Sequence, residues 1–254
     1  MPLGGRWPLT AVYKPVDPIA RWFLRLQLIS GGVLLIQTVF SFLCVKIYYE
    51  YALGQEFDNH TYYIVDKTYQ NLGYIMWPIW GVSIALMMWW MFRGYGNLHA
   101  MRVPGLQFAA KWVVIGWLIP LVNFVVPYRI MSELYRGSDP KLAADPAPPL
   151  NTIKVPWTIK LWWACVLLDM LLGELSRYYE RQLASSWGAN WEYVTSTLVI
   201  VAGNIVALGE LFLLIGITQQ ITARLAAGYQ LREEKSRLSE TAALQTEPVQ
   251  PLSP

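Results

Sequence analysis

Long blocks without a single charged residue constrain this chain more than any other feature of its sequence. Residues 26–45, between Arg25 and Lys46, are 20 consecutive uncharged residues, and residues 68–92 are 25 more. A helix needs about 20 apolar residues to cross the roughly 30 Å hydrocarbon core of a bilayer. Only 15% of the 254 residues are charged and 55% are hydrophobic. We therefore expect an all-α, polytopic integral membrane protein.

Apolar blocks with few or no charged residues divide the chain into five membrane segments and two tails. We expect full spans at about residues 26–46, 72–92, 157–175 and 194–217, and a shorter block at 112–128 that two prolines interrupt. The segments make up one transmembrane helical domain over residues 21–230. A cytoplasmic N-terminal arm at 1–20 precedes it, and a disordered cytoplasmic tail at 231–254 follows it. The first block is as long as a true span, so we expect no cleavable signal peptide.

The distribution of Lys and Arg predicts the topology, because these residues collect at the cytoplasmic ends of spans. If all five blocks cross, the two sides receive nine and eleven basic residues, and neither orientation is favoured. If the 112–128 block enters and leaves on the same side, 16 basic residues lie inside and 4 lie outside. This predicts four full spans, both termini in the cytoplasm, and a re-entrant or interfacial segment hinged near Pro120. A short fifth crossing is the alternative, because 17 residues is the lower limit for a span.

Two motifs around the short block resemble a known family. An Arg-x-x-x-Asn-x-x-Ala turn runs from Arg93 through Asn97, and a Trp-rich segment then carries Pro120-x-x-Asn123 and a second proline, Pro127. Trp162-Trp163 and the late Ile217-Thr218-Gln219-Gln220 fit the same pattern. Over roughly residues 20–225 the chain resembles the bacterial membrane proteins grouped as domain of unknown function 4328. The resemblance implies a bacterial multi-span membrane protein and implies no activity.

The polar residues around the short block are the first candidate site. They are Arg93, Asn97, Pro120, Asn123 and Arg129. Broken membrane segments expose backbone groups that can bind ions or substrates. The alternative is structural: the same side chains satisfy those backbone groups and contact lipid phosphates.

Ionisable and amide side chains inside the last two spans are the second candidate site. They are Lys160, Asp169, Glu174, Asn204 and Glu210. At about 1.5 Å per residue, counted from outer ends near Ser176 and Val194, Lys160 and Glu210 come to the same depth. We expect them to form an ion pair, and we expect a hydrogen bond between Asp169 and Asn204. Either contact could be structural or part of a transport path.

Small and polar side chains mark the surfaces on which helices are expected to pack. One face of the first span carries Ser30, Gln37, Ser41 and Cys44. In the second span, Gly81 and Ala85 form a small-xxx-small pair. The alternative for the polar face is a pore lining, which four spans could form only as an oligomer.

We find no constellation that predicts catalysis, and we expect a protein that is not an enzyme. The two histidines, His60 and His99, fall on opposite sides of the membrane in this topology, so they cannot share a metal. Cys44 and Cys165 are too far apart for a disulfide. No phosphate-binding loop, metalloprotease helix or nucleophile elbow is present. We expect no catalytic, cofactor or metal site.

The sequence therefore predicts a non-catalytic interaction or assembly component of the bacterial inner membrane. Its partners would be the lipid bilayer and either a second copy or another membrane protein. Nucleic acid is excluded, because the net charge of +3 is small and scattered. One alternative is a small oligomeric channel or transporter that uses the Pro120 segment with Glu210 and Asp169. Another is an enzyme that acts on lipids at the cytoplasmic face.

Overall fold

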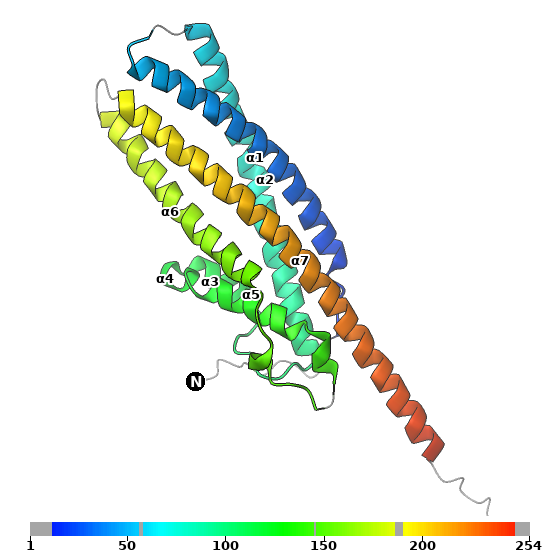
Figure 1. Ribbon diagram of the computed structural model, residues 1–254. Helices are drawn as coiled ribbons and strands as arrows, with labels where there is room; N and C mark the ends of the chain where they lie inside the picture. The colour runs from blue at the N-terminus through cyan, green and yellow to red at the C-terminus, as the bar shows by residue number, and fades with distance from the viewer. Residues whose placement is uncertain (1–11, 56–57, 145, 186–189, 247–254) are drawn as a thin grey trace, which may run out of the picture.

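Four long helices run side by side, and short helices gather at one end of them (Figure 1). The computed structural model describes residues 12–55, 58–144, 146–185 and 190–246. The long helices are α1 (Asp17–Ala52), α2 (Asn59–Ala100), α6 (Trp157–Ser185) and α7 (Asn190–Thr246). The short ones are α3 (Trp112–Leu118), α4 (Pro120–Asn123), α5 (Val126–Gly137) and the 3-10 turns η1 (Pro140–Ala143) and η2 (Leu150–Thr152). We call the end that holds the short helices the base, and the end where α1 and α6 stop the far end.

Three helices are long and apolar enough to cross a membrane. They are α1, α2 and the Trp191–Thr241 stretch of α7, with mean hydropathies of 2.1, 1.5 and 2.4 over 18-residue windows. These confirm that the predicted spans 26–46, 72–92 and 194–217 lie in helices of sufficient length and apolarity. α6 is not among them, because its residues 157–175 carry Lys160, Asp169 and Glu174. A fourth crossing therefore stays a prediction.

The helices extend well beyond the predicted spans, most of all at the C-terminus. α7 has 57 residues, a length of about 86 Å at 1.5 Å per residue. The prediction of a disordered tail from residue 231 is wrong as far as Thr246, where the helix ends. Charged side chains one turn apart support it, as in the 2.6 Å ion pair between Arg237 and Glu233. At the other end of the chain, α1 begins at Asp17, within the predicted N-terminal arm at residues 1–20. Residues 1–11 and 247–254 lie outside the described residues.

The long helices form a row in the order α2, α1, α7, α6. α1 packs against both α2 and α7, and α6 packs along α7. Of the four residues on the predicted polar face of α1, Ser30, Ser41 and Cys44 are buried and Gln37 is half-buried. The Ser83 hydroxyl of α2 donates to Gln27 Oε1 of α1 over 3.1 Å. The small pair on α2 does not behave as predicted: Gly81 and Ala85 are exposed, and nothing lies within 4 Å of a Cβ at Gly81.

The short block at 112–128 forms a helical hairpin. Ile119 is extended, with φ −94° and ψ 116°, and breaks the helix between α3 and α4. Pro120 then lies in the first turn of α4, where a missing backbone N–H costs nothing. The chain reverses so that α3 packs against α5, and a Cβ at Gly116 would lie 2.7 Å from Val126 Cγ1. With its seven residues, α3 is about 10 Å long.

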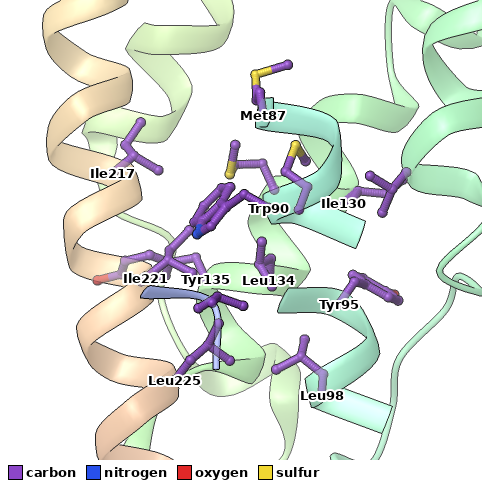
Figure 2. Close-up of a cluster of buried hydrophobic side chains, with 14 of the residues drawn as sticks. Met87, Trp90, Tyr95, Leu98, Ile130, Leu134, Tyr135, Ile217, Ile221 and Leu225 are labelled. Carbon is purple, nitrogen blue, oxygen red and sulfur yellow. The ribbon is translucent and has the colours of Figure 1, made fainter. Parts of the chain in front are cut away.

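The hydrophobic core is concentrated at the base, where α2, α5 and α7 meet (Figure 2). Trp90 of α2 is fully buried, and its indole N–H donates to Thr222 Oγ1 of α7 over 3.0 Å. Because Gly94 has no side chain, Leu134 of α5 and Leu225 of α7 can pack closely against the α2 backbone. The packing therefore joins the hairpin rigidly to the long helices.

Candidate functional site

A cavity of about 420 Å³ opens at the base, between α5, α7 and the proline-rich segment that follows α5. We call it the base pocket. Its lining is formed by Tyr135, Asp139, Lys141, Pro148, Thr152, Ile153, Lys154 and Arg224. Three of these side chains are cationic and one is anionic, so the lining carries a formal charge of +2. The volume falls within the range of about 300–1,000 Å³ that small-molecule sites have.

Arg224 of α7 forms the inner wall of the base pocket. Its Nη2 pairs with Asp139 Oδ2 over 2.6 Å, and its Nη1 donates to the Tyr135 hydroxyl over 2.9 Å. The guanidinium also lies over the Tyr135 ring, 4.1 Å from its centroid. Gln220, one turn earlier on α7, donates to the same hydroxyl over 3.4 Å. Because the Tyr135 oxygen accepts in both bonds, its own proton remains available to a further acceptor.

Three anchors hold the segment that follows α5 over α7. The first is the Arg224–Asp139 ion pair, whose side chains are only 19% and 14% exposed. In the second, Arg136 Nε donates to the Ile153 carbonyl over 3.0 Å. In the third, Arg232 Nη2 donates to the Leu142 carbonyl over 3.2 Å. The segment therefore packs on the helix, although its five prolines between residues 137 and 156 are typical of an extended loop.

A second polar cluster lies behind the core, around Glu133 of α5. This side chain is buried, and its Oε2 accepts from the Tyr95 hydroxyl of α2 and from the Gln107 backbone N–H at 3.2 Å. The Tyr95 oxygen accepts in turn from the Phe108 N–H over 3.3 Å. Burial raises the pKa of the Glu133 carboxyl above its ordinary value of 4.5, although these hydrogen bonds oppose the shift. The cluster fixes the loop between α2 and α3.

Asn97, a predicted site residue, holds the N-terminal segment rather than a ligand. Its side-chain oxygen accepts from the Lys14 N–H over 2.9 Å, and its amide donates to the Lys14 carbonyl over 2.7 Å. Tyr13, the preceding residue, stacks on Tyr229 of α7 with ring centroids 4.0 Å apart. The Asn97 side chain thus satisfies backbone N–H and C=O groups, as the structural interpretation predicts. These backbone groups belong to the N-terminal segment, however, and not to the short block at 112–128.

The other predicted residues around the short block do not converge. Arg93 is half-buried on α2, Asn123 is half-buried in α4, and Arg129 is exposed on α5. Within the described residues, no hydrogen bond or ion pair joins any of the three to another side chain. Pro120 is exposed at the turn of the hairpin. The structure therefore does not assemble these residues into one site.

The predicted Lys160–Glu210 ion pair is wrong, and the reason is the helix register. α6 continues to Ser185 and α7 begins at Asn190, so the two helices meet farther out than the hydropathy predicts. Glu210, 20 residues into α7, then lies level with the region around Cys165 and acts electrostatically on it. Its charged neighbour is Asp169, one turn farther along α6, while Lys160 is exposed near the base.

The predicted Asp169–Asn204 hydrogen bond is also absent from the part of the chain that the structure describes. Asn204 instead donates from its amide to Ser41 Oγ of α1 over 3.4 Å. Glu174 pairs with Arg177 on the exposed surface of α6. Asp169 of α6 and Glu210 of α7 are therefore two half-buried carboxyls close enough to interact electrostatically.

The described residues contain no group of three or more His, Cys, Asp or Glu side chains that could hold a metal ion. His60 lies in the first turn of α2 and His99 in its last turn. Their positions differ by 39 residues along one helix, which corresponds to about 58 Å. The two side chains are therefore too far apart to share a metal ion, and their placement on opposite sides of a membrane stays a prediction.

The base pocket was missed by the sequence prediction. Its residues come from three separate segments, and none of them carries a recognised motif. One signal was available: Leu142 and Leu150 are isolated apolar residues in a polar, proline-rich stretch, and both are buried in the core. They indicate that the stretch packs on the helices.

Comparison with known proteins identifies one family. No curated protein and no solved structure matches the chain. The sequence model of the family described as "Domain of unknown function (DUF4328)" matches residues 58–223. The matched region begins at the residue that caps α2 and ends beside Arg224, so it contains the hairpin, the Glu133 cluster and most of the base pocket. It leaves out α1, which the sequence resemblance includes. Because the match covers more than half of the chain, this protein belongs to the DUF4328 family.

Proposed function

We propose that this protein is a non-catalytic docking component of the bacterial cell membrane. In this proposal α1, α2, α6 and α7 cross the bilayer, both termini lie in the cytoplasm, and the α3–α5 hairpin dips into the inner leaflet. The base faces the cytoplasm. A partner protein docks on the part of α7 that extends beyond the base.

The exposed turn of the hairpin supports the membrane placement. Leu118 is 71% exposed, Leu121 is 83% exposed and Phe124 is 49% exposed. Large apolar side chains at a helix turn are costly in water, and lipid would cover them. α3 is too short to cross by itself, so the hairpin would enter and leave on one side.

The basic residues support the orientation. Lys46, Lys67, Arg177 and Arg181 lie on helix segments near the far end, and the remaining basic residues of the described chain lie toward the base. A cytoplasmic base follows, because cytoplasmic flanks collect Lys and Arg.

The observation that carries the docking role is the free end of α7. Beyond Leu225 the helix still contacts η1 and the N-terminal segment as far as Arg232, and from there it continues to Thr246 without another helix beside it (Figure 1). Leu231 and Leu238, seven residues apart, lie on one face and are 45% and 66% exposed. Apolar side chains at this spacing are the anchors by which helices pack on one another.

Photo-crosslinking in intact membranes tests the docking role. A photoreactive amino acid replaces Leu231 or Leu238 in turn, and the matched control carries it at Ser236, on another face of the same helix. We expect one discrete crosslinked product from positions 231 and 238 and none from position 236. Equal crosslinking at all three positions, or none together with a monomeric mass in detergent, contradicts the proposal. Labelling of single cysteines in the 138–144 segment from each side of the membrane tests the orientation.

The neighbouring carboxyls Asp169 and Glu210 favour a second candidate, an oligomeric channel or transporter. Ionisable groups inside a membrane segment are functional candidates by default, and within the described residues this pair has no cationic partner. In this case Glu210→Gln abolishes proton or cation flux into proteoliposomes, and Glu174→Gln, on the exposed surface of α6, does not. Flux that is absent in the wild type excludes this candidate.

A further inference from the structure

We propose that the base pocket binds a phosphate group, with Lys141 and Lys154 as the residues that contact it. This inference goes beyond the docking role. It rests on the proposed orientation in one respect only, because that orientation makes a lipid headgroup one possible source of the phosphate.

The charges of the pocket are not balanced. Asp139, its carboxylate, is already engaged: one oxygen pairs with Arg224, and the other accepts from the Lys141 backbone N–H over 2.9 Å. The Lys141 and Lys154 side chains line the same cavity, and neither has a hydrogen bond or ion pair within the described residues. Two ammonium groups that line one cavity, with no unpaired carboxylate among its described lining residues, attract an anion.

The two lysines are positioned by their backbones. Asp139 caps η1, the turn that carries Lys141. Arg136 binds the carbonyl of Ile153, the residue directly before Lys154. Lysine side chains on a mobile loop would lose more conformational entropy on binding, so anchored backbones favour a defined site.

The remaining lining suits a phosphate rather than a carboxylate alone. The Tyr135 hydroxyl has a proton to donate, and Arg224, which is paired with Asp139, holds this hydroxyl in place on the inner wall. A phosphate group accepts hydrogen bonds from several donors at once, and the three donors of the pocket come from separate parts of the chain: Lys141 from η1, Lys154 from the end of the proline-rich segment, and Tyr135 from α5. The 420 Å³ volume leaves room for a group attached to the phosphate.

The location allows two sources for the phosphate. Arg224 is the first basic residue of α7, at the boundary between the apolar stretch and the charged end of the helix. In the proposed orientation this boundary lies at the level of the lipid headgroups of the inner leaflet. A lipid phosphate from the side and a soluble phosphate compound from the cytoplasm present the same chemistry to the pocket.

Binding by the full-length protein tests the site. Inorganic phosphate is titrated into the detergent-solubilised protein by calorimetry, with chloride at equal ionic strength as the reference. Native mass spectrometry then counts phosphatidic acid retained from mixed nanodiscs. The variants are Lys141→Gln/Lys154→Gln and the matched control Lys160→Gln, an exposed lysine outside the pocket. We expect binding by wild type and control, and a loss on the order of 10-fold or more in the double variant.

Each outcome of these experiments either supports or overturns the proposed phosphate site. Retention of phosphatidic acid alone supports the site with a lipid source, and phosphate binding alone supports it with a soluble source. No saturable binding of either probe, or equal affinity in the double variant, overturns the proposal. If the double variant does not fold, Lys154→Gln alone replaces it, because this side chain is exposed and makes no hydrogen bond within the described residues. A wrong membrane placement would be detected separately by vesicle flotation, in which the protein would not float with the vesicles. The phosphate titration in detergent would still be interpretable in that case.

Discussion

The base and the far half of this molecule are built from the same long helices but are held together in different ways. At the base, α2, α5 and α7 surround fully buried side chains such as Trp90 and Leu134, and loops cover the remaining sides. Toward the far end only a row of helices is left, and Trp77 of α2 is 69% exposed. The base has a core like that of a soluble protein, whereas the far half leaves large apolar side chains exposed, which a bilayer would cover in the proposed placement. Substitutions at matched residue types should therefore have large effects in one half and small effects in the other.

Truncation of a buried tryptophan should show the largest difference. Trp90→Ala removes a fully buried side chain and its hydrogen bond to Thr222, and we expect a loss of about 3–5 kcal/mol in the free energy of unfolding. Trp77→Ala, in the far half, should change it by no more than about 0.5 kcal/mol in detergent. Chemical unfolding monitored by the remaining tryptophans measures both. Similar losses would mean that the far half has a protein core of its own.

The second-largest difference between the two halves should come from removing one partner of an ion pair. Asp139→Asn removes the charge opposite Arg224 in a largely buried pair, and we expect a loss of about 1–3 kcal/mol. Glu174→Gln removes the carboxylate of the exposed Glu174–Arg177 pair near the far end, and water screens such pairs almost completely. We expect its unfolding temperature in detergent to equal that of the wild type. An unchanged Asp139→Asn variant would show that the proline-rich segment is not anchored by this pair.

Glycines give the third comparison. A Cβ at Gly116 would lie 2.7 Å from Val126, and a Cβ at Gly81 would have nothing within 4 Å. We expect Gly116→Ala to destabilise by about 1–2 kcal/mol, since overpacking of a stiff β-branched neighbour outweighs the helix preference of alanine. Gly81→Ala should be neutral or slightly stabilising. Thermal unfolding in detergent compares them, and a neutral Gly116→Ala would mean that α3 moves freely against α5.

The sequence predicts the helices whose positions depend on local hydrophobicity. It does not predict features that depend on contacts between distant parts of the chain. Charge-free runs locate α1, α2 and the apolar part of α7, because burial of an uncharged helix in hydrocarbon is a local property. The break at Pro120 is equally local. The sequence does not predict where the helices end at the far end of the molecule. Residues 176–185 of α6 are polar, yet they continue the helix. Their extra turns shift the register against α7 and bring Glu210 to Asp169 instead of Lys160.

The base pocket could not be predicted for a related reason. Asp139 and Arg224 are 85 residues apart, and no local pattern links them. The proline-rich segment has the composition of an extended linker, and its two buried leucines are the signal that it packs against the rest of the base. Asn97 shows the same limit, since the motif that contains it is visible but its partner, the Lys14 backbone, lies 83 residues away.

The smallest expected effect concerns pH and the Glu133 cluster at the base. Burial raises the pKa of Glu133 above 4.5, while hydrogen bonds from Tyr95 and Gln107 and the charge of Arg136 oppose the shift. A carboxyl with a raised pKa binds more protons in the folded state than in the unfolded state. Its contribution is therefore fully present below about pH 4.5 and is lost as the pH rises through the raised value. Wild type should lose stability over this interval, and Glu133→Gln, which stays neutral and can still accept from Tyr95, should not. Unfolding temperatures measured across the interval compare the two proteins. Parallel pH profiles would show that Glu133 has the same proton affinity folded and unfolded, and that the base, like the far half, holds no buried charge that responds to pH.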